Sequence, residues 1–164
     1  MKITHLAFST AAAALLISAS PAAFAQLPTT KVLTIDVAQT IAQEAMNKCR
    51  ENGFKVTVTV VDSANMLKAF LRDDGAPRAT IEIGRRKINS VMAFGAPSGP
   101  PANLPAGAPV PPPILPDMVN LQGGLPIKVG NDLIGAVSVS GAPGGDKDAA
   151  CASYALEKVA GKLK

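Results

Sequence analysis

The most restrictive feature of this 164-residue chain is a proline-dense stretch between residues 95 and 122, which holds nine of its 14 prolines. Proline has no backbone N–H and its ring clashes with the preceding helical turn, so neither a helix nor a central strand survives this density. We expect a long Pro-rich loop with polyproline-type extension around residues 110–113. A loop of this length inside a compact domain is uncommon, and the sequence leaves open whether it is functional or a tolerated insertion.

The first 25 residues predict a secretory signal peptide. Lys2 supplies the positive start, a short apolar stretch follows, and Ala23 and Ala25 place small residues where a signal peptidase cleaves. The apolar run is too short to span a bilayer comfortably, and no positive cluster follows it, which argues against a membrane anchor. We therefore expect cleavage after Ala25 and one mature domain over residues 26–164, periplasmic or secreted.

Loss of the signal peptide would remove the only histidine, His5. This excludes a Ser-His-Asp triad, a His-Cys dyad and histidine-ligated zinc or haem. Without Lys2, 15 basic residues face 12 acidic ones, a net charge of +3. The charges are scattered and the chain has one tyrosine and no tryptophan, so nucleic-acid binding is not expected. Cys49 and Cys151 lie in predicted helices, and the sequence leaves open whether they form a disulfide or are two small buried side chains.

Hydrophobic spacing predicts the order helix, hairpin, helix, loop, hairpin, helix. Apolar residues three and four apart predict helices over residues 34–53, 78–95 and 146–164. Residues 55–62 alternate valine and threonine as a half-buried strand does, and residues 66–72 complete a first hairpin. A second hairpin joins residues 125–129 and 132–140 through Gly130 and Asn131. Hairpins imply an antiparallel sheet whose apolar faces the helices must cover, so the fold class is α+β with one core.

Two glycine positions call for interpretation. Gly84 lies inside a predicted helix, where it costs about 1 kcal/mol relative to alanine, which predicts that something packs closely against it. Gly144 and Gly145 precede the last helix as in a phosphate-binding loop, but Asp146 and Asp148 would repel a phosphate. We interpret these glycines as a turn and these aspartates as helix caps. No spacing brings the other acidic candidates together for hydrolysis or metal binding, and we interpret them as solvated residues: Asp62, Asp73, Asp74 and Glu82.

Three segments in order resemble the GlcG/HbpS family of haem-binding and cobalamin-associated proteins, which includes the C-terminal domain of PduO-type proteins. The segments are VVDSANMLKAFLRDDGAP, GRRKINSVMAFGAPS and GGLPIKVGNDLIGAVSVSGAPGGDKDAACA. The resemblance spans about residues 34–163. It implies a profilin-like α/β/α sandwich around a five-stranded antiparallel sheet, assembly into a homo-oligomer, and tetrapyrrole binding.

The resemblance implies an exported haem-binding protein without catalytic turnover, acting in haem sensing, storage or delivery, with cobalamin a less favoured ligand. A family member places its axial residue just before the paired glycines, here Gly123 and Gly124. Met118 lies there, and its thioether can ligate haem iron, although packing is the alternative role. Tyr154 and the cysteines are further conceivable ligands, but they lie in predicted helices. The candidate partners of the haem propionates are basic residues of the second helix: Arg78, Arg85, Arg86 and Lys87.

Two other functions remain open from the sequence. The chain could be a non-haem accessory or scaffold protein that docks through its Pro-rich loop to an exported partner. It could also be an enzyme acting on a small carbonyl compound or hydroxy acid, although no catalytic constellation is visible.

Overall fold

The computed structural model describes residues 29–100 and 115–163. The predicted signal peptide and the predicted extension at residues 110–113 therefore lie outside the described residues. The predicted order of helices and hairpins is confirmed. The elements are α1 (Ile35–Glu51), β1 (Thr57–Asp62), β2 (Leu67–Arg72), α2 (Ala79–Phe94), β3 (Gly124–Val129), β4 (Asp132–Ser140) and α3 (Gly145–Val159), which continues into a 3-10 turn (Ala160–Lys162).

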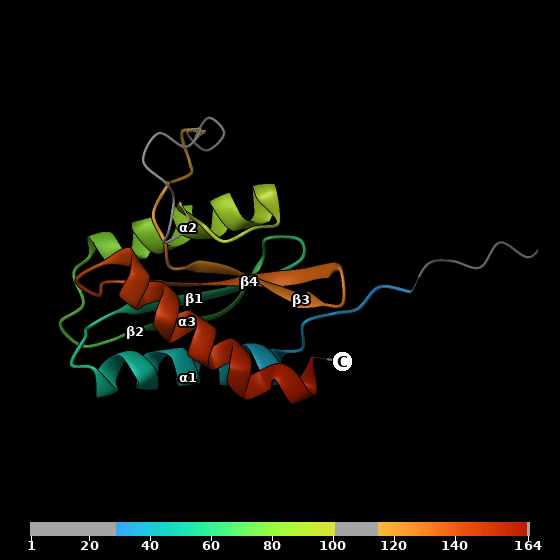
Figure 1. The fold of residues 1–164 in the computed structure, drawn as a ribbon, viewed down its shortest axis with the longest axis horizontal. Coiled ribbons are helices and arrows are strands. Elements are labelled where there is room, and N and C mark those ends of the chain that lie inside the picture. The colour runs from blue at the N-terminus through green and yellow to red at the C-terminus, as the bar shows by residue number, and fades with distance from the viewer. Residues whose placement is uncertain (1–28, 101–114, 164) are drawn as a thin grey trace, which may run out of the picture.

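The elements form three layers, with α2 on one face of the sheet and α1 and α3 on the other (Figure 1). The strand order is β2-β1-β4-β3, and every neighbouring pair is antiparallel. The described residues thus contain four strands, and the five-stranded sheet implied by the family resemblance is wrong for them. Pro97 and Pro116, in the described part of the Pro-rich stretch, have no backbone N–H that could bond to a neighbouring strand. The profilin-like assignment stays a prediction.

The central strand β1 is buried on both faces, so the predicted half-buried strand is wrong. Val58 and Val60 belong to the main core with α1 and α3, as the alternation predicted. Thr57 and Thr59, on the other face, are buried too, because α2 covers them. The Thr57 hydroxyl forms a hydrogen bond with the Thr80 hydroxyl of α2, with 2.7 Å between the two Oγ1 atoms.

Gly84 lets α2 approach the sheet closely, as predicted. A Cβ at this position would lie 3.4 Å from Ser138 Oγ. The same hydroxyl donates a hydrogen bond to the Gly84 carbonyl oxygen, at 2.9 Å. The glycine therefore brings the helix backbone within hydrogen-bonding distance of β4, which offsets its low helix propensity.

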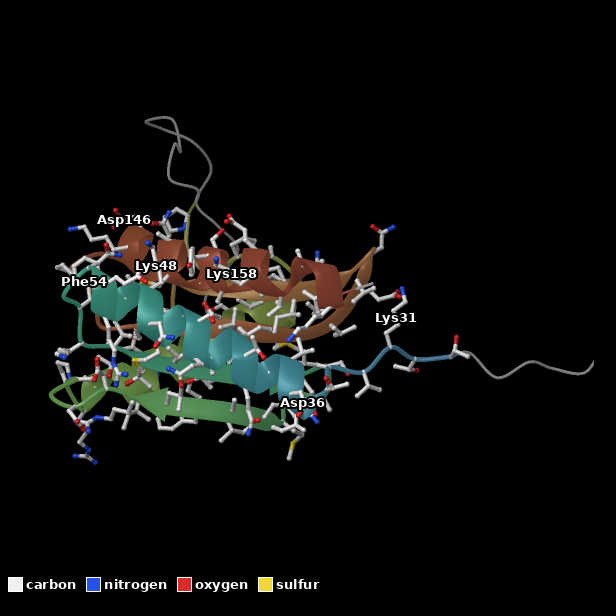
Figure 2. All side chains as sticks on the ribbon, turned by 90° about the horizontal axis from the view of Figure 1, so that it is seen from below. Lys31, Asp36, Lys48, Phe54, Asp146 and Lys158 are labelled. Atoms are coloured by element: carbon white, nitrogen blue, oxygen red, sulfur yellow. A yellow bond between two sulfur atoms is a disulfide. The ribbon has the colours of Figure 1, made fainter. Side chains whose placement is uncertain are left out.

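On the opposite face, α1 and α3 pack side by side and are joined by a disulfide between Cys49 and Cys151. Both cysteines are buried, with Cα atoms 5.6 Å apart, so the structure answers the question that the sequence left open. Figure 2 shows Lys48 and Lys158 on the outer side of these two helices. The ammonium groups of both lie 5.0 Å from the ring centroid of Tyr154, within cation–π range.

Local signals set the ends of α1. Thr34 is the N-cap, and its hydroxyl accepts a hydrogen bond from Val37 N at 3.4 Å. Gly53 follows the helix with a φ of +76°, a conformation that glycine adopts at no steric cost. No helix within the described ranges has the length and apolar character needed to cross a membrane.

Candidate functional site

An open groove lies between α2 and β2, on the sheet face that α2 covers only in part. α2 packs against β1, β3 and β4, and so leaves the same face of β2 accessible. The groove has a volume of about 460 Å³, and we call it the α2–β2 groove. Its lining residues come from α2, β1, β2 and the intervening turn: Thr59, Val61, Asn65, Leu67, Phe70, Ile81, Arg85, Ile88 and Asn89.

The walls of the groove are mostly apolar. Ile81, Arg85 and Ile88 are four and three residues apart, so they share one side of α2. Facing them, β2 contributes Leu67 and Phe70, which are 62% and 40% exposed, and Ile81 is 39% exposed. Large apolar side chains clustered at a surface mark a site for a ligand or partner. The groove is therefore the candidate site.

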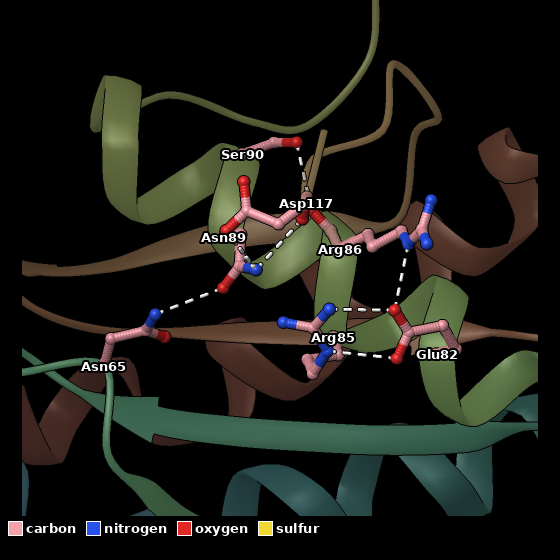
Figure 3. Close-up of polar contacts among 7 residues, drawn as sticks. All are labelled: Asn65, Glu82, Arg85, Arg86, Asn89, Ser90 and Asp117. Carbon is pink, nitrogen blue, oxygen red and sulfur yellow. Dashed lines mark hydrogen bonds and ion pairs between the residues drawn. The ribbon is translucent and has the colours of Figure 1, made fainter. Parts of the chain in front are cut away.

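Arg85, one of the lining residues, belongs to a basic cluster with Arg86 and Glu82 (Figure 3). Arg85 donates two hydrogen bonds to the Glu82 carboxylate, from Nη2 at 2.8 Å and from Nε at 3.0 Å. Arg86 Nε donates a third, at 2.9 Å. These two guanidinium groups lower the pKa of Glu82 to about 2. Glu82, Arg85 and Arg86 together carry a net positive charge, which the Asp117 carboxylate offsets in part at Arg85. A guanidinium that faces the groove can bind an anionic ligand group.

A chain of hydrogen bonds runs from the lining residues Asn65 and Asn89 to Asp117 and holds that segment on α2 (Figure 3). Asn65 Nδ2 donates to Asn89 Oδ1 at 3.1 Å. Asn89 Nδ2 donates in turn to the Asp117 carbonyl oxygen at 3.0 Å and to its Oδ2 at 3.2 Å. Ser90 Oγ donates to the Val119 carbonyl oxygen and accepts from Val119 N. The half-buried Met118 is thereby held beside α2, although it is not among the residues that line the groove.

A second, buried cluster contains the other predicted site residues. The Lys87 ammonium donates to Asp148 Oδ2 at 2.7 Å and to the Val139 carbonyl oxygen at 2.8 Å. Both charged side chains are almost fully buried, at 2% and 5% exposed. Burial lowers the pKa of Lys87 and raises the pKa of Asp148, while their mutual attraction opposes both shifts. Lys87 therefore points into the molecule, away from the surface where the sequence predicted that it would meet a ligand.

Gly123 and Gly124 are packed against this cluster. A Cβ on Gly123, whose φ is +121°, would lie 2.5 Å from Lys87 Nζ. A Cβ on Gly124 would lie 2.8 Å from Ser98 Oγ, which accepts a hydrogen bond from Gly124 N at 2.8 Å. The paired glycines thus make room for the ion pair and for the returning Pro-rich stretch.

The structure divides the predicted site residues into separate places. It brings Arg85 and Arg86 together, and it gathers Lys87, Gly123 and Gly124 elsewhere. Arg78 is the exposed N-cap residue of α2 and makes no capping side-chain bond. Sequence reasoning missed Asn65 and Phe70. The sequence placed Asn65 only in a predicted turn and Phe70 only in a predicted strand, with no sign of a shared site. In the structure Asn65 has a φ of +59°, and Phe70 lies in β2.

Three acidic residues differ from their sequence-based interpretation. Asp73 is buried and accepts hydrogen bonds from Arg50 at 3.0 and 3.1 Å, so it is not a solvated turn residue. The predicted helix caps Asp146 and Asp148 are wrong, because the N-cap of α3 is Gly144 and no side chain caps it. Asp148 instead pairs with Lys87 and accepts from Ala142 N at 2.9 Å. Within residues 29–100 and 115–163, no group of three His, Cys, Asp or Glu side chains could hold a metal ion.

The fold and groove together define a three-layer α+β domain suited to an apolar ligand that carries an acidic group. The sequence matches the family described as "Haem degrading protein HbpS-like" over residues 33–157, and the chain therefore belongs to the HbpS-like family. Among curated proteins, none matches the chain.

Three solved structures place the fold among its relatives. The crystal structure of HbpS is 28% identical, with a TM-score of 0.72, and the match covers 85% of this chain and 99% of that one. Protein ORFY of Klebsiella pneumoniae is 24% identical, with a TM-score of 0.70 and coverages of 82% and 94%. The PduOC:heme complex is 18% identical, with a TM-score of 0.66 and coverages of 77% and 94%, a likeness of fold alone.

Proposed function

We propose that the chain is an exported tetrapyrrole-binding protein without catalytic turnover, with haem as its ligand and haem sensing, storage or delivery as its role. The observation that carries the proposal is an apolar groove lined by Arg85 in a member of the HbpS-like family. The haem complex of PduOC, a protein of the same fold, gives further support.

The residues of the α2–β2 groove suit the two chemical parts of haem. Leu67, Phe70 and Ile81 offer apolar surface to the macrocycle, as ligand pockets commonly do. Arg85 lines the groove and belongs to the basic cluster, so it is the residue we assign to a propionate, with Arg86 beside it. Lys87 is not assigned to the ligand, because its ammonium already binds Asp148 inside the molecule.

Met118 remains our candidate axial ligand. The hydrogen bonds of Asn89 and Ser90 hold its neighbours Asp117 and Val119 on α2, close to the lining residue Asn89. A thioether is an established ligand of haem iron. When bound, haem supplies a redox-active iron, whereas the protein supplies the apolar walls, the basic cluster and this thioether.

The proposed export is supported by the disulfide. Structural disulfides persist in oxidising compartments and are rare in the cytosol, and Cys49 and Cys151 form such a bond here. Together with the predicted signal peptide, this favours a periplasmic or secreted protein. An exported protein partner and a homo-oligomer belong to the same proposal.

Hemin titration of the purified protein tests the proposal. We expect a shifted Soret band that saturates. Ile81→Glu places a carboxylate in the groove and should weaken binding at least tenfold. Ile35→Glu is the matched control, because Ile35 is 45% exposed on α1, outside the groove, and should bind as the native protein does. A native spectrum identical to that of free hemin would refute the proposal.

Two further readouts of the same titration test its parts. Met118→Ala should change the Soret maximum, and an unchanged spectrum would remove Met118 as the axial ligand.

The family's description names haem degradation. A Soret band that moves on reduction but keeps its intensity in the presence of oxygen supports binding without turnover, whereas its steady loss would support degradation.

A further inference from the structure

A small cavity lies between α2 and the start of α3, and we call it the α2–α3 cavity. Its volume is about 220 Å³. Its lining includes Ile83 of α2, Ser140 at the end of β4, and Gly144 and Gly145 at the start of α3. No residue lines both this cavity and the α2–β2 groove, so the proposed haem site leaves it unused.

Ser140 presents a hydroxyl to this cavity. The residue is only 2% exposed, and buried hydroxyls are normally hydrogen-bonded. On the same face of the sheet, the Ser138 hydroxyl donates to the Gly84 carbonyl oxygen and the Thr57 hydroxyl bonds to Thr80. Within residues 29–100 and 115–163, no hydrogen bond involves Ser140 Oγ, and no side-chain polar atom shut off from solvent lacks a partner. The Ser140 hydroxyl is therefore open to the cavity and available to a ligand.

The N-terminus of α3 opens on the same cavity. Its N-cap, Gly144, has a φ of +148°, and no side chain caps the helix. The first N–H groups of a helix have no partner inside it, and among the described residues those of Gly145 and Asp146 find none elsewhere. Because α3 is 15 residues long, its positive end favours an anionic group at this position.

The two aspartates near this end do not exclude an anion. Asp148 lines the cavity, but its charge is paired with the Lys87 ammonium at 2.7 Å, and Ala142 N donates to its other oxygen. Asp146 is exposed and is not among the lining residues. Lys87 uses two of the three donors of its ammonium, on Asp148 and on the Val139 carbonyl oxygen. The lining charges thus sum to zero, and the donors of Ser140 and α3 remain available.

We propose that the α2–α3 cavity binds a small monocarboxylate, whose oxygens accept hydrogen bonds from Ser140 Oγ and from the first N–H groups of α3. The cavity is smaller than the pockets of about 300–1,000 Å³ that hold drug-sized ligands, so the acid is a small one. Ile83 and Leu121 offer apolar surface to the rest of the acid. A single negative charge fits better than a phosphate dianion, because the lining supplies no net positive charge to compensate a second one.

Amide NMR spectra of the isotope-labelled protein, recorded without hemin, test the proposal. The probes are sodium acetate, propionate and benzoate, with sodium chloride at the same ionic strength as the reference. We expect the Gly145 and Asp146 signals to shift and to saturate. Acetate has four non-hydrogen atoms and cannot bind more tightly than about 40 µM. The absence of a saturating shift with all three acids would overturn the proposal.

Acetamide tests whether the charge of the ligand is recognised. It has nearly the shape of acetate but no charge, and hydrogen bonds to a charged acceptor are the stronger ones. We expect acetamide to bind at least about tenfold more weakly than acetate. Equal binding of the two compounds would contradict an anion site.

Ile83→Glu and Ile83→Gln separate charge from shape within the protein. Ile83 is half-buried and lines the cavity, and the two replacements have nearly the same size. Only glutamate adds a negative charge, so it should weaken acetate binding at least about tenfold relative to glutamine. Thermal unfolding shows that both variants are folded. Equal affinities of the two folded variants would be incompatible with a carboxylate in this cavity.

Ser140→Ala removes the proposed hydroxyl donor without adding a charge. We expect it to weaken acetate binding at least about fivefold, the effect of one hydrogen bond to a charged group. Ser63→Ala, at an exposed position in the turn between β1 and β2, is the matched control and should bind acetate as the native protein does. Native affinity in Ser140→Ala would overturn the proposed site.

The α2–α3 cavity and the proposed haem site can be tested independently. Because the two sites share no lining residue, Ser140→Ala should titrate with hemin as the native protein does. Failure of the native protein to bind hemin, with acetate binding intact, overturns the proposed function and leaves the carboxylate site in place.

Discussion

Lys87 and Asp148 link α2 to α3 through charges that are almost completely removed from water. Each ion has a second hydrogen-bond partner, the Val139 carbonyl oxygen for Lys87 and Ala142 N for Asp148. A buried pair of this kind contributes little net stability over an apolar pair, but the loss of one partner leaves the other charge unpaired. The pair therefore specifies how the two helices and Gly123 fit together.

Lys87→Met should destabilise the protein by about 3–5 kcal/mol, because the Asp148 carboxylate would remain buried without its cation. Adding Asp148→Asn should recover most of the loss, since a neutral amide still accepts from Ala142 N. Urea unfolding followed by circular dichroism measures both changes. A double variant no more stable than Lys87→Met would contradict the assignment.

Asp73 should set part of the stability at low pH. The Arg50 guanidinium holds the pKa of this carboxyl below its ordinary value of 3.8. Its contribution to folding is therefore complete above the unfolded-state pKa and is lost as the pH falls through the folded-state pKa. Asp73→Asn should lower Tm at pH 7, and its deficit against the native protein should shrink as the pH falls below about 4. Asp74→Asn, at the exposed neighbouring position, is the matched control and should leave Tm at pH 7 close to that of the native protein.

At the scale of the elements, the disulfide between α1 and α3 fixes the two helices that cover one sheet face. Its cysteines are 102 residues apart, so reduction releases a long loop in the unfolded chain. Replacement of both cysteines by alanine should lower the free energy of unfolding by about 2–5 kcal/mol. Denaturant unfolding of the native and doubly substituted proteins gives this difference. Identical midpoints would show that the bond contributes no stability.

The helices and hairpins were predictable because their signals are local. Apolar residues at helical spacing and the Gly130 turn identified elements that the structure confirms. The burial of Thr57 and Thr59 was not predictable, since it depends on where α2 lies over the sheet.

The candidate site was predictable only in part, for the same reason. The sequence identified Arg85 and Arg86 as basic residues of one helix, but not which of the four basic candidates would face a groove. Spacing places Lys87 one residue beyond Arg86 and about 100° around the helix, which is enough to bury it. The groove itself arises because α2 leaves β2 uncovered, a tertiary arrangement that no local pattern records.

At the scale of the whole molecule, the folded core begins close to the predicted cleavage point. Leu33 is buried in the main core, and α1 begins at Ile35. The disulfide between α1 and α3 is one that an exported chain can form.

Expression of the full chain in a bacterial host should yield a protein that begins at Gln26 and has no free thiol. Intact mass and alkylation under denaturing conditions measure both properties, because a disulfide leaves Cys49 and Cys151 unreactive until it is reduced. Replacing Ala23 and Ala25 by aspartate removes the small residues that the peptidase requires and should leave the leader attached. Protein that begins at Gln26 but has two alkylated cysteines would show that the leader is cleaved without formation of the disulfide. Native protein that retains residues 1–25 would contradict the predicted signal peptide.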